Sequence, residues 1–374
     1  MSKSVNLIHV GIGLIGGSAI QMIRSLRDNW RSQLGVDVLH RAFVDTSGGV
    51  VCDEPAGYSE ATIEAILSAR TGGDKLTTAA PSLGLTPRTV DDALAIAFEM
   101  GPTIVIDCAA SDRTADLSAR AIAGGHGAVF SNKAPLALPW DDKRSKLLWG
   151  ETHFGGRVRY EATCGAGLPV IATLRSLLDS GDSIVEISGA LSGTFGAIFA
   201  DLAVGVPFSA AVRSARNKGY TEPDPRDDLS GLDVARKTLI LARTIGLPID
   251  LDSIAVETLV PAHLAGVSVD EFLDGLERED SVMADRVDQA RSRGSTLKYL
   301  ARVSASEGVS VGLSETPANT ILGSLQGPEN ILTFRSERYD AYPLTVIGPG
   351  AGASVTAAGV VANLLSLVRE FGED

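Results

Sequence analysis

Cysteine and histidine are both scarce in this chain. The three cysteines, Cys52, Cys108 and Cys164, are odd in number, lie far apart and form no CxxC pair. This pattern argues against a disulfide framework and against a structural zinc site. The five histidines are scattered and show no HExxH spacing, which argues against a zinc hydrolase.

Basic blocks and long apolar runs are also lacking. The chain carries 33 Lys and Arg against 46 Asp and Glu, a formal net charge of −13, whereas a nucleic-acid-binding surface is basic. The N-terminal residues include no signal-peptide hydrophobic region, and no apolar stretch approaches the roughly 20 residues that span a bilayer. We therefore expect no nucleic-acid partner, no membrane partner and a cytoplasmic location.

The residues that are present favour a globular protein of two domains. A chain of 374 residues exceeds what one hydrophobic core usually supports, and 44% of the residues are hydrophobic. Aromatic residues make up only 5%, while glycines number 40. This balance suits tight turns and close packing of helices on a sheet.

The first 150 residues predict alternating strands and helices. Strands are expected at 5–10, 38–44, 103–108 and 128–130, and helices at 17–30, 62–70, 90–99 and 114–123. This order predicts an α/β fold with a Rossmann-type, doubly wound parallel sheet. After residue 150 the alternation is less regular, which indicates a mixed α/β domain. Its strands are expected at 158–163, 183–188, 309–313 and 344–347, and a helix at 232–245. The charge-rich stretch 270–293 is interpreted as a solvated helical face.

A glycine-rich turn lies between the first expected strand and helix. Gly11 allows a tight turn, Gly13 allows the backbone to approach a pyrophosphate, and Gly16 allows close packing of helix on strand. The N–H groups and the positive end of the helix then bind phosphate. Such turns also occur for structural reasons alone, but the strand and helix around this one favour dinucleotide binding. The cofactor-binding residues expected here are Gly11, Ile12, Gly13, Leu14, Ile15 and Gly16.

Two residues of the second expected strand leave the coenzyme open between NAD and NADP. Asp45 ends the strand and suits the ribose hydroxyls, although it lies farther from the glycines than the usual ~20 residues. A turn residue beside Ser47 explains Asp45 equally well. Arg41 lies nearby and suits the 2′-phosphate of NADP.

Charged residues crowd into positions 222–237. Pro223 and Pro225 hold the first part extended, and Asp233 and Lys237 then fall at i and i+4 on one face of a helix. A surface helix with an ion pair is the plain interpretation. The density of charge beside two prolines instead favours a site for an amino acid, because carboxylates bind its ammonium and lysines bind its carboxylate and reacting oxygen. The cluster comprises Glu222, Asp224, Arg226, Asp227, Asp228, Asp233, Arg236 and Lys237.

Five ordered motifs, spread over most of the chain, resemble those of the homoserine dehydrogenase family. The charged segment at 219–237, GYTEPDPRDDLSGLDVARK, is similar to the family signature almost letter for letter. The other four motifs are SNKAPLA at 131–137, YEATCGAGLP at 160–169, SGALSGT at 188–194 and GPGAGASVTAAG at 348–359. The resemblance implies a dinucleotide-binding domain at 1–150 and a substrate-binding, catalytic and dimerisation domain at 151–340. A C-terminal segment at 341–374 would return to the first domain.

The resemblance also implies roles for individual residues. Lys237 would be the catalytic acid/base that protonates the carbonyl oxygen of a semialdehyde, and Lys133 a second catalytic lysine near the substrate and the nicotinamide. Asp233 would share in catalysis and, with Glu222, bind the polar groups of the substrate. Asp228 would support this substrate-binding site.

Further implied contacts involve the main chain. Gly350 and Gly352 would approach the nicotinamide end of the cofactor, and Ala109 would contact it where family members often carry a hydroxyl residue. A sodium ion would be held by main-chain oxygens at four positions, and Cys164 stands where an aliphatic residue is common without affecting such a ligand. These positions are Glu161, Cys164, Ala166 and Leu168.

The function implied by the resemblance is the interconversion of L-aspartate 4-semialdehyde and L-homoserine with NAD or NADP, in threonine and methionine biosynthesis. A homodimer with small-molecule partners is implied as well, and we expect no regulatory or aspartate kinase domain. No cysteine pairs with a histidine as an acyl-forming aldehyde dehydrogenase would need. Two alternatives stay open: another NAD(P)-dependent amino-acid or semialdehyde oxidoreductase, and a non-catalytic dinucleotide-binding regulator.

Overall fold

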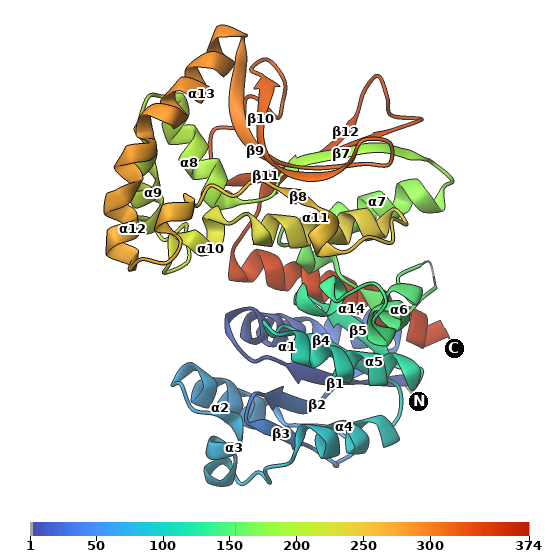
Figure 1. The fold of residues 1–374 in the computed structure, drawn as a ribbon. Coiled ribbons are helices and arrows are strands. Elements are labelled where there is room, and N and C mark those ends of the chain that lie inside the picture. The colour runs from blue at the N-terminus through green and yellow to red at the C-terminus, as the bar shows by residue number, and fades with distance from the viewer. Residues whose placement is uncertain (1–2, 154, 374) are drawn as a thin grey trace. The chain divides into compact units, whose positions relative to one another are not determined.

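The computed structural model describes residues 3–153 and 155–373. The chain divides into two units, Met1–Gly167 with Gly352–Asp374, and Leu168–Ala351. The second unit is thus inserted into the first (Figure 1). These limits differ from the predicted 150/151 and 340/341, because strand β6 (Val158–Arg159) joins the first sheet and strand β12 (Leu344–Pro349) joins the second.

A six-stranded sheet forms the centre of the first unit, with the strand order β3-β2-β1-β4-β5-β6. The remaining strands are β1 (Lys3–Val10), β2 (Val36–Asp45), β3 (Gly48–Val51), β4 (Thr103–Asp107) and β5 (Gly127–Phe130). All pairs are parallel except β2–β3. The predicted α/β fold is confirmed, but the sheet is mixed. Strand β3 was not predicted, because its Gly48 and Gly49 indicate only a turn.

Helices cover both faces of this sheet, and β1 shows how the sequence directs them. Val5 and Leu7 lie in a core with side chains of α1 and α14, whereas Ile8 and Val10 pack on the opposite face with α4 and α5. This alternation follows from the two-residue period of a strand. The helices of the unit are α1 (Leu14–Leu34), α2 (Glu60–Thr71), α3 (Leu76–Ala79), α4 (Val90–Glu99), α5 (Ala115–Ala123), α6 (Lys143–Gly150) and α14 (Ala353–Glu373).

The C-terminal helix α14 corrects one expectation. Its stretch Ala353–Phe371 is long and apolar enough to cross a membrane by length and composition, so the statement that no apolar stretch approaches that length was wrong. Val360, Leu364 and Leu367 are nevertheless fully buried in the core that α14 shares with α1. The apolar side of α14 therefore serves the core of the first unit.

A second six-stranded sheet, in the order β12-β11-β7-β9-β10-β8, forms the second unit. Its pairs are antiparallel except β8–β10, and Ile331 of β11 lies opposite Ala190 of β7. Ala190, Ile331 and Leu300 form a small apolar cluster on one face. The strands other than β12 are β7 (Ile184–Ala190), β8 (Ala255–Val256), β9 (Ser295–Ser304), β10 (Gly308–Pro317) and β11 (Glu329–Ser336).

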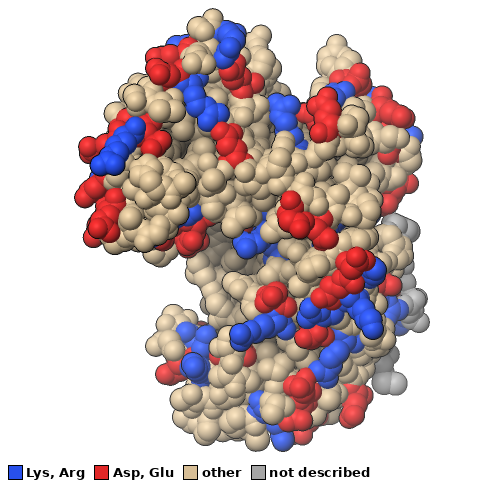
Figure 2. Space-filling model, viewed as in Figure 1, with Lys and Arg blue, Asp and Glu red and all other residues tan. Residues whose placement is uncertain are grey.

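Helices α8 and α11 pack against β9, where Tyr299 stacks on Phe195 with ring centroids 3.8 Å apart. The stretch 270–293 is helical, and only Met283 and Ala290 are buried in α13, which agrees with a solvated face. Acidic and basic side chains are interspersed over this region (Figure 2). The helices of the unit are α7 (Val170–Asp179), α8 (Gly193–Ala203), α9 (Phe208–Asn217), α10 (Pro225–Leu229), α11 (Leu232–Thr244), α12 (Val269–Gly275) and α13 (Asp280–Ser292).

Two buried histidines lie side by side on β1 and β2. His9 Nε2 is 2.8 Å from His40 Nδ1, and the two rings stack on each other and on Phe43. Burial lowers the pKa of both, to about 3 for His40, helped by the neighbouring Arg27 and Arg24. The pKa of His9 lies well below 6.5, mainly because of burial and secondly because of the neighbouring His40.

We predict that this pair makes the first unit acid-sensitive. Below pH 6.5 the two histidines bind protons in the unfolded chain but stay neutral in the folded protein. The free energy of unfolding should therefore decrease as the pH is lowered, by up to about 1.4 kcal/mol per pH unit for each histidine. Urea unfolding between pH 7.5 and 4.5 measures this slope, which should flatten in the double variant His9→Leu, His40→Leu. The exposed His263→Gln is the control, and an unchanged slope in the double variant would contradict the prediction.

Candidate active site

The structure shows a different environment at each of the three glycines of the predicted dinucleotide turn. Gly11 has φ +81°, and a Cβ there would lie 2.6 Å from the backbone nitrogen of Ala109. A Cβ on Gly16 would lie 2.1 Å from the carbonyl oxygen of Gly11. A Cβ built on Gly13 would meet no heavy atom of the described residues within 4 Å. The turn thus brings the ends of β1 and β4 together and leaves a free approach at the start of α1.

This turn lies where the strand order reverses, between β1 and β4. In open α/β sheets ligands bind at such a switch point, at the carboxyl ends of the strands. Helix α1 directs its positive N-terminal end there and has no acidic residue in its first turn to oppose an anion. Leu14 is 79% exposed and Ile12 is buried.

The loops after β4 and β5 are joined by a buried network that the sequence did not reveal. Asp107 accepts hydrogen bonds from Thr114 Oγ1 at 2.6 Å, from Ala109 N–H at 3.0 Å and from Asn132 Nδ2 at 3.2 Å. Burial raises the pKa of Asp107 to about 6, although these donors oppose the rise. The network fixes Ala109 and, through Asn132, the start of the Lys133 loop.

Asp45 and Arg41 do not have the roles considered for them. The side chain of Asp45 is 6% exposed, and its two oxygens accept from Ser47 N–H at 2.8 Å and Leu76 N–H at 2.9 Å, with Arg70 at 3.2 Å. The Arg41 guanidinium is buried and donates to Asn6 and to the carbonyl groups of Cys52 and Glu54. Both side chains are engaged within the protein, so neither is available to choose between NAD and NADP.

Asp228 is the centre of the charged segment in the second unit. Its carboxylate accepts from Thr194 Oγ1 at 2.9 Å and from the N–H of Glu222 at 2.8 Å. Burial raises the pKa of Asp228, and the nearby charges of Asp233 and Asp227 add to the rise. Asp228 therefore fixes the Glu222 loop to the start of α8, while Glu222 itself is exposed.

Lys237 and Asp233 form the ion pair that their spacing predicts, with Nζ 2.9 Å from Oδ2. Lys237 Nζ also donates to the carbonyl oxygen of Leu191 at 2.7 Å. The lysine side chain is only 12% exposed, whereas that of Asp233 is 49% exposed. The ammonium is thus held between a helix and the end of β7, with a carboxylate beside it that solvent can still reach.

Thr194 is a site residue that sequence reasoning missed. Its hydroxyl lies within hydrogen-bond distance of both Tyr220 O and Asp228 Oδ1, so these two acceptors share its one proton. Its place in the SGALSGT motif was the available signal. Arg226, by contrast, belongs to the scaffold: it pairs with Asp224, donates to the carbonyl group of Val267 and lies over the ring of Phe272.

The predicted cation-binding positions lie in one tight, buried segment. Gly165 and Ala166 are consecutive residues with positive φ, and Ala166 at 56° is the only non-glycine with positive φ among the described residues. Cys164 is fully buried. Glu161 O already accepts from Cys164 N–H, and Leu168 O accepts from Val170 N–H. No group of three or more His, Cys, Asp or Glu side chains is placed to hold a metal ion in the described part of the chain.

Gly350 and Gly352 end up in different units. Gly350 follows β12 in the second unit, and a Cβ there would lie 2.0 Å from Cγ of Asn330. Gly352 has φ +122° and precedes α14 in the first unit. The turn between them is therefore the point where the chain crosses back.

Comparison with known proteins identifies the family. The homoserine dehydrogenase family model matches residues 169–365. A homoserine dehydrogenase of Schizosaccharomyces pombe is 31% identical over 382 residues, covering 98% of this chain and 96% of that protein. The chain belongs to the homoserine dehydrogenase family.

The chain also matches longer relatives and solved structures. A bifunctional aspartokinase/homoserine dehydrogenase of Arabidopsis thaliana is 40% identical over 275 residues, but this chain spans only 30% of its length. A Candida auris protein of unknown function has a TM-score of 0.84 at 29% identity, with 98% of both chains covered. A hyperthermophilic archaeal homoserine dehydrogenase in complex with NADPH shares the fold, with a TM-score of 0.72, 21% identity and 97% of both chains covered.

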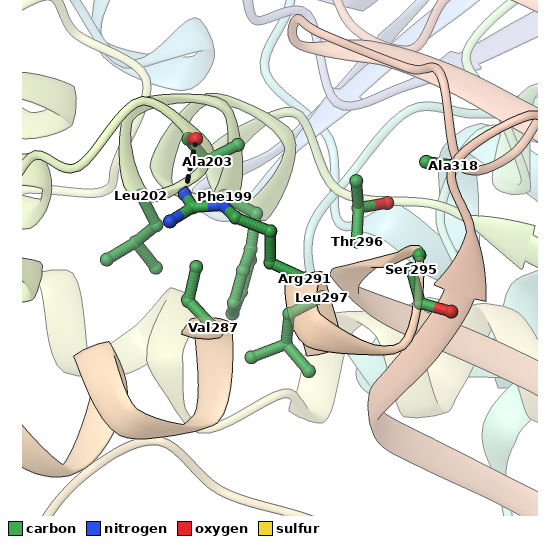
Figure 3. A pocket seen from close by; sticks show the side chains of 10 residues that line it. Phe199, Leu202, Ala203, Val287, Arg291, Ser295, Thr296, Leu297 and Ala318 are labelled. Atoms are coloured by element: carbon green, nitrogen blue, oxygen red, sulfur yellow. Dashed lines mark hydrogen bonds between the residues drawn. The ribbon is translucent and has the colours of Figure 1, made fainter. Parts of the chain in front are cut away.

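One cavity of this homoserine dehydrogenase-family chain lies away from these residues. It measures about 190 Å³ and is bounded by α8, α13 and the start of β9. Phe199, Leu202 and Val287 give it apolar walls, and Arg291 at its edge donates to Ala203 O (Figure 3). It contains none of the predicted site residues, so it is not the candidate active site.

We predict that Gly13→Ala separates binding from stability in this family member. Gly13 has φ −84°, which alanine adopts, and open space around its Cα. The free energy of unfolding should therefore change by less than about 0.5 kcal/mol. The dinucleotide affinity should fall about tenfold or more, because the methyl group obstructs the approach of the pyrophosphate. Titration calorimetry measures the affinity; Gly17→Ala on the same helix is the control, and an unchanged affinity in Gly13→Ala would refute the assignment.

Proposed function

We propose that the chain is a homoserine dehydrogenase that interconverts L-aspartate 4-semialdehyde and L-homoserine with NADPH. One observation carries the proposal: the Lys237 ammonium is held by Leu191 O and Asp233, close in the chain to a loop of carboxylates that is fixed by Asp228. Such a set suits a small amino acid that bears both an ammonium and a reducible carbonyl. The family assignment supports this reaction class.

The dinucleotide turn of the first unit has the features that a coenzyme needs. Gly13 is unobstructed, and the start of α1 is free of acidic residues. When bound, a reduced nicotinamide supplies the hydride. The residues that would hold the coenzyme are Gly11, Ile12, Gly13, Leu14, Ile15, Gly16 and Ala109, with Lys133, Gly350 and Gly352.

In the proposed mechanism Lys237 moves the proton. Its Nζ donates a proton to the carbonyl oxygen as this oxygen becomes a hydroxyl, and accepts one in the reverse direction. Asp233 orients the ammonium, and the exposed carboxylate of Glu222 binds the substrate ammonium. Asp228, whose two oxygens both accept protein donors, positions this set. Lys133 is proposed as the second lysine, on a loop held by Asn132.

The buried main-chain oxygens of the Glu161–Leu168 segment suit a sodium ion, which prefers oxygen ligands. We propose that Glu161, Cys164, Ala166 and Leu168 supply them. The cation would stabilise this loop, where Ala166 is held in a left-handed conformation. The homodimer and the cytoplasmic location stay predictions.

We predict that NADPH serves at least as well as NADH. An acidic residue that binds the adenosine ribose hydroxyls repels the 2′-phosphate of NADPH, but the Asp45 carboxylate is engaged by Ser47, Leu76 and Arg70. Values of kcat/KM for the two coenzymes with aspartate semialdehyde, with and without sodium, measure this preference. A preference for NADH of tenfold or more would contradict it.

We predict that Lys237→Met lowers kcat strongly while coenzyme binding is retained. Loss of a general acid typically lowers kcat by about 10²–10⁴-fold, whereas the glycine turn is unaffected. The assay follows NADPH oxidation with aspartate semialdehyde, and calorimetry follows NADPH binding.

The matched control is Lys218→Met, at an exposed lysine of the same unit. Wild-type protein that binds NADPH but oxidises it with no amino-acid semialdehyde would instead support a dinucleotide-binding regulator. Full activity in Lys237→Met would refute the proposed role of Lys237.

A further inference from the structure

We infer that the side-chain amide of Asn330 binds the carboxamide group of the coenzyme's nicotinamide. The inference rests on the proposed function, since it requires that the chain bind a nicotinamide dinucleotide. Asn330 lies outside the five motifs of the sequence, and no role was predicted for it. Its contacts and its position on the second sheet carry the argument.

Asn330 is a buried amide with neither polar atom paired. The residue is 0% exposed at the start of β11, and neither Oδ1 nor Nδ2 has a hydrogen-bond partner within residues 3–153 and 155–373. Buried polar groups are nearly always hydrogen-bonded, because leaving one unpaired costs most of its hydration. A bound polar group can supply the missing partners of such an amide, so Asn330 is a candidate binding position.

The amide is directed at the C-terminal glycine turn. Asn330 pairs with Gly348 on β12, and a Cβ on Gly350 would lie 2.0 Å from Asn330 Cγ, 2.1 Å from Oδ1 and 2.4 Å from Nδ2. Any side chain at Gly350 would occupy the space of the amide. The glycine therefore allows the amide to lie against bare backbone.

Asn330 also lies near the end of β7, beside the lysine of the proposed mechanism. Ile331, its neighbour in β11, lies opposite Ala190, the last residue of β7. The next residue, Leu191, supplies the carbonyl oxygen that binds Lys237 Nζ. A carbon that receives hydride must lie beside the nicotinamide ring, and its oxygen must reach Lys237, so the ring and its substituent belong in this neighbourhood.

The chemistry of the amide selects the ligand group. Nδ2 needs an acceptor and Oδ1 needs a donor, and a second primary carboxamide offers both in one plane. The ammonium and carboxylate of an amino acid also offer both, but a charged group buried beside a neutral amide lacks its counter-charge. Those charged groups are better matched by Glu222, Asp233 and the lysines. The neutral carboxamide is therefore the partner that fits.

The experiment compares two ligands and several variants. Titration calorimetry measures the binding of NADPH and of its reduced 3-acetylpyridine analogue, which keeps the carbonyl oxygen and lacks the amide N–H. Wild type should prefer NADPH by about tenfold, the worth of one buried hydrogen bond. In Asn330→Leu and in Asn330→Ala this preference should fall to about one, because the acceptor for the amide N–H is gone.

Stability gives a second, opposite readout. Removing an unpaired buried amide should raise the melting temperature of the ligand-free Asn330→Leu variant by about 2–4 °C, while its affinity for NADPH falls. An amide with a purely structural role would give the reverse, a lower melting temperature and an unchanged preference. Asn330→Ala provides the affinity test if leucine does not fit. Asn319→Leu, at an exposed position of the same unit, is the control.

The outcomes separate the inference from the proposed function. An unchanged preference in both Asn330 variants overturns the inference, and so does a loss of homoserine affinity alone, which would assign the amide to the amino acid. If wild type shows the preference and loses it in the variants, yet turns over no aspartate semialdehyde, only the proposed function fails. If wild type binds neither dinucleotide, both are wrong.

Discussion

The candidate site of the second unit depends on one carboxylate, that of Asp228. By accepting from Thr194 and from the N–H of Glu222, it fixes the proline-containing loop to the start of α8. The residues just before α8 also supply the Leu191 carbonyl that binds Lys237. The acidic loop and the lysine are therefore positioned from the same short connection between β7 and α8. This explains how Leu191 and Lys237, which are 46 positions apart, come into contact.

The sequence pattern predicted the features that depend on residues close together in the chain. The run from Val5 to Gly16 gave the strand, the turn and the helix, because glycine conformation and apolar periodicity act within a few residues. The ion pair between Asp233 and Lys237 followed from helical spacing in the same way. Strand β3 and the placement of β6 in the first sheet were missed, since they depend on pairing with strands chosen by the whole fold. The Asp107–Asn132 network was missed because its members are 25 positions apart.

Asp45 and Arg41 show how a residue type can suggest the wrong role. Both suited coenzyme recognition by charge and position. A buried charge must find partners, however, and these two find them within the fold: Asp45 in the residues that begin α3, and Arg41 in the carbonyl groups after β3. Charge at the end of a strand is therefore a weak guide to ligand contact until its protein partners are known. Asn330 shows the opposite case: it is neutral and the sequence predicted no role for it, yet its amide has no hydrogen-bond partner among the described residues.

The insertion of the second unit affects the order in which the polypeptide can fold during its synthesis. Side chains of α14 complete the apolar core beneath β1, and a Cβ on Gly167 would lie 2.1 Å from Val355 O, so the outgoing and returning segments touch. The first unit cannot close that core while it emerges from the ribosome, because α14 is translated after all of the inserted half. The inserted half is complete before that helix, so it has the first opportunity to fold. Helix α1, which follows the glycine turn, therefore gains its contact with α14 only after the inserted half has been translated.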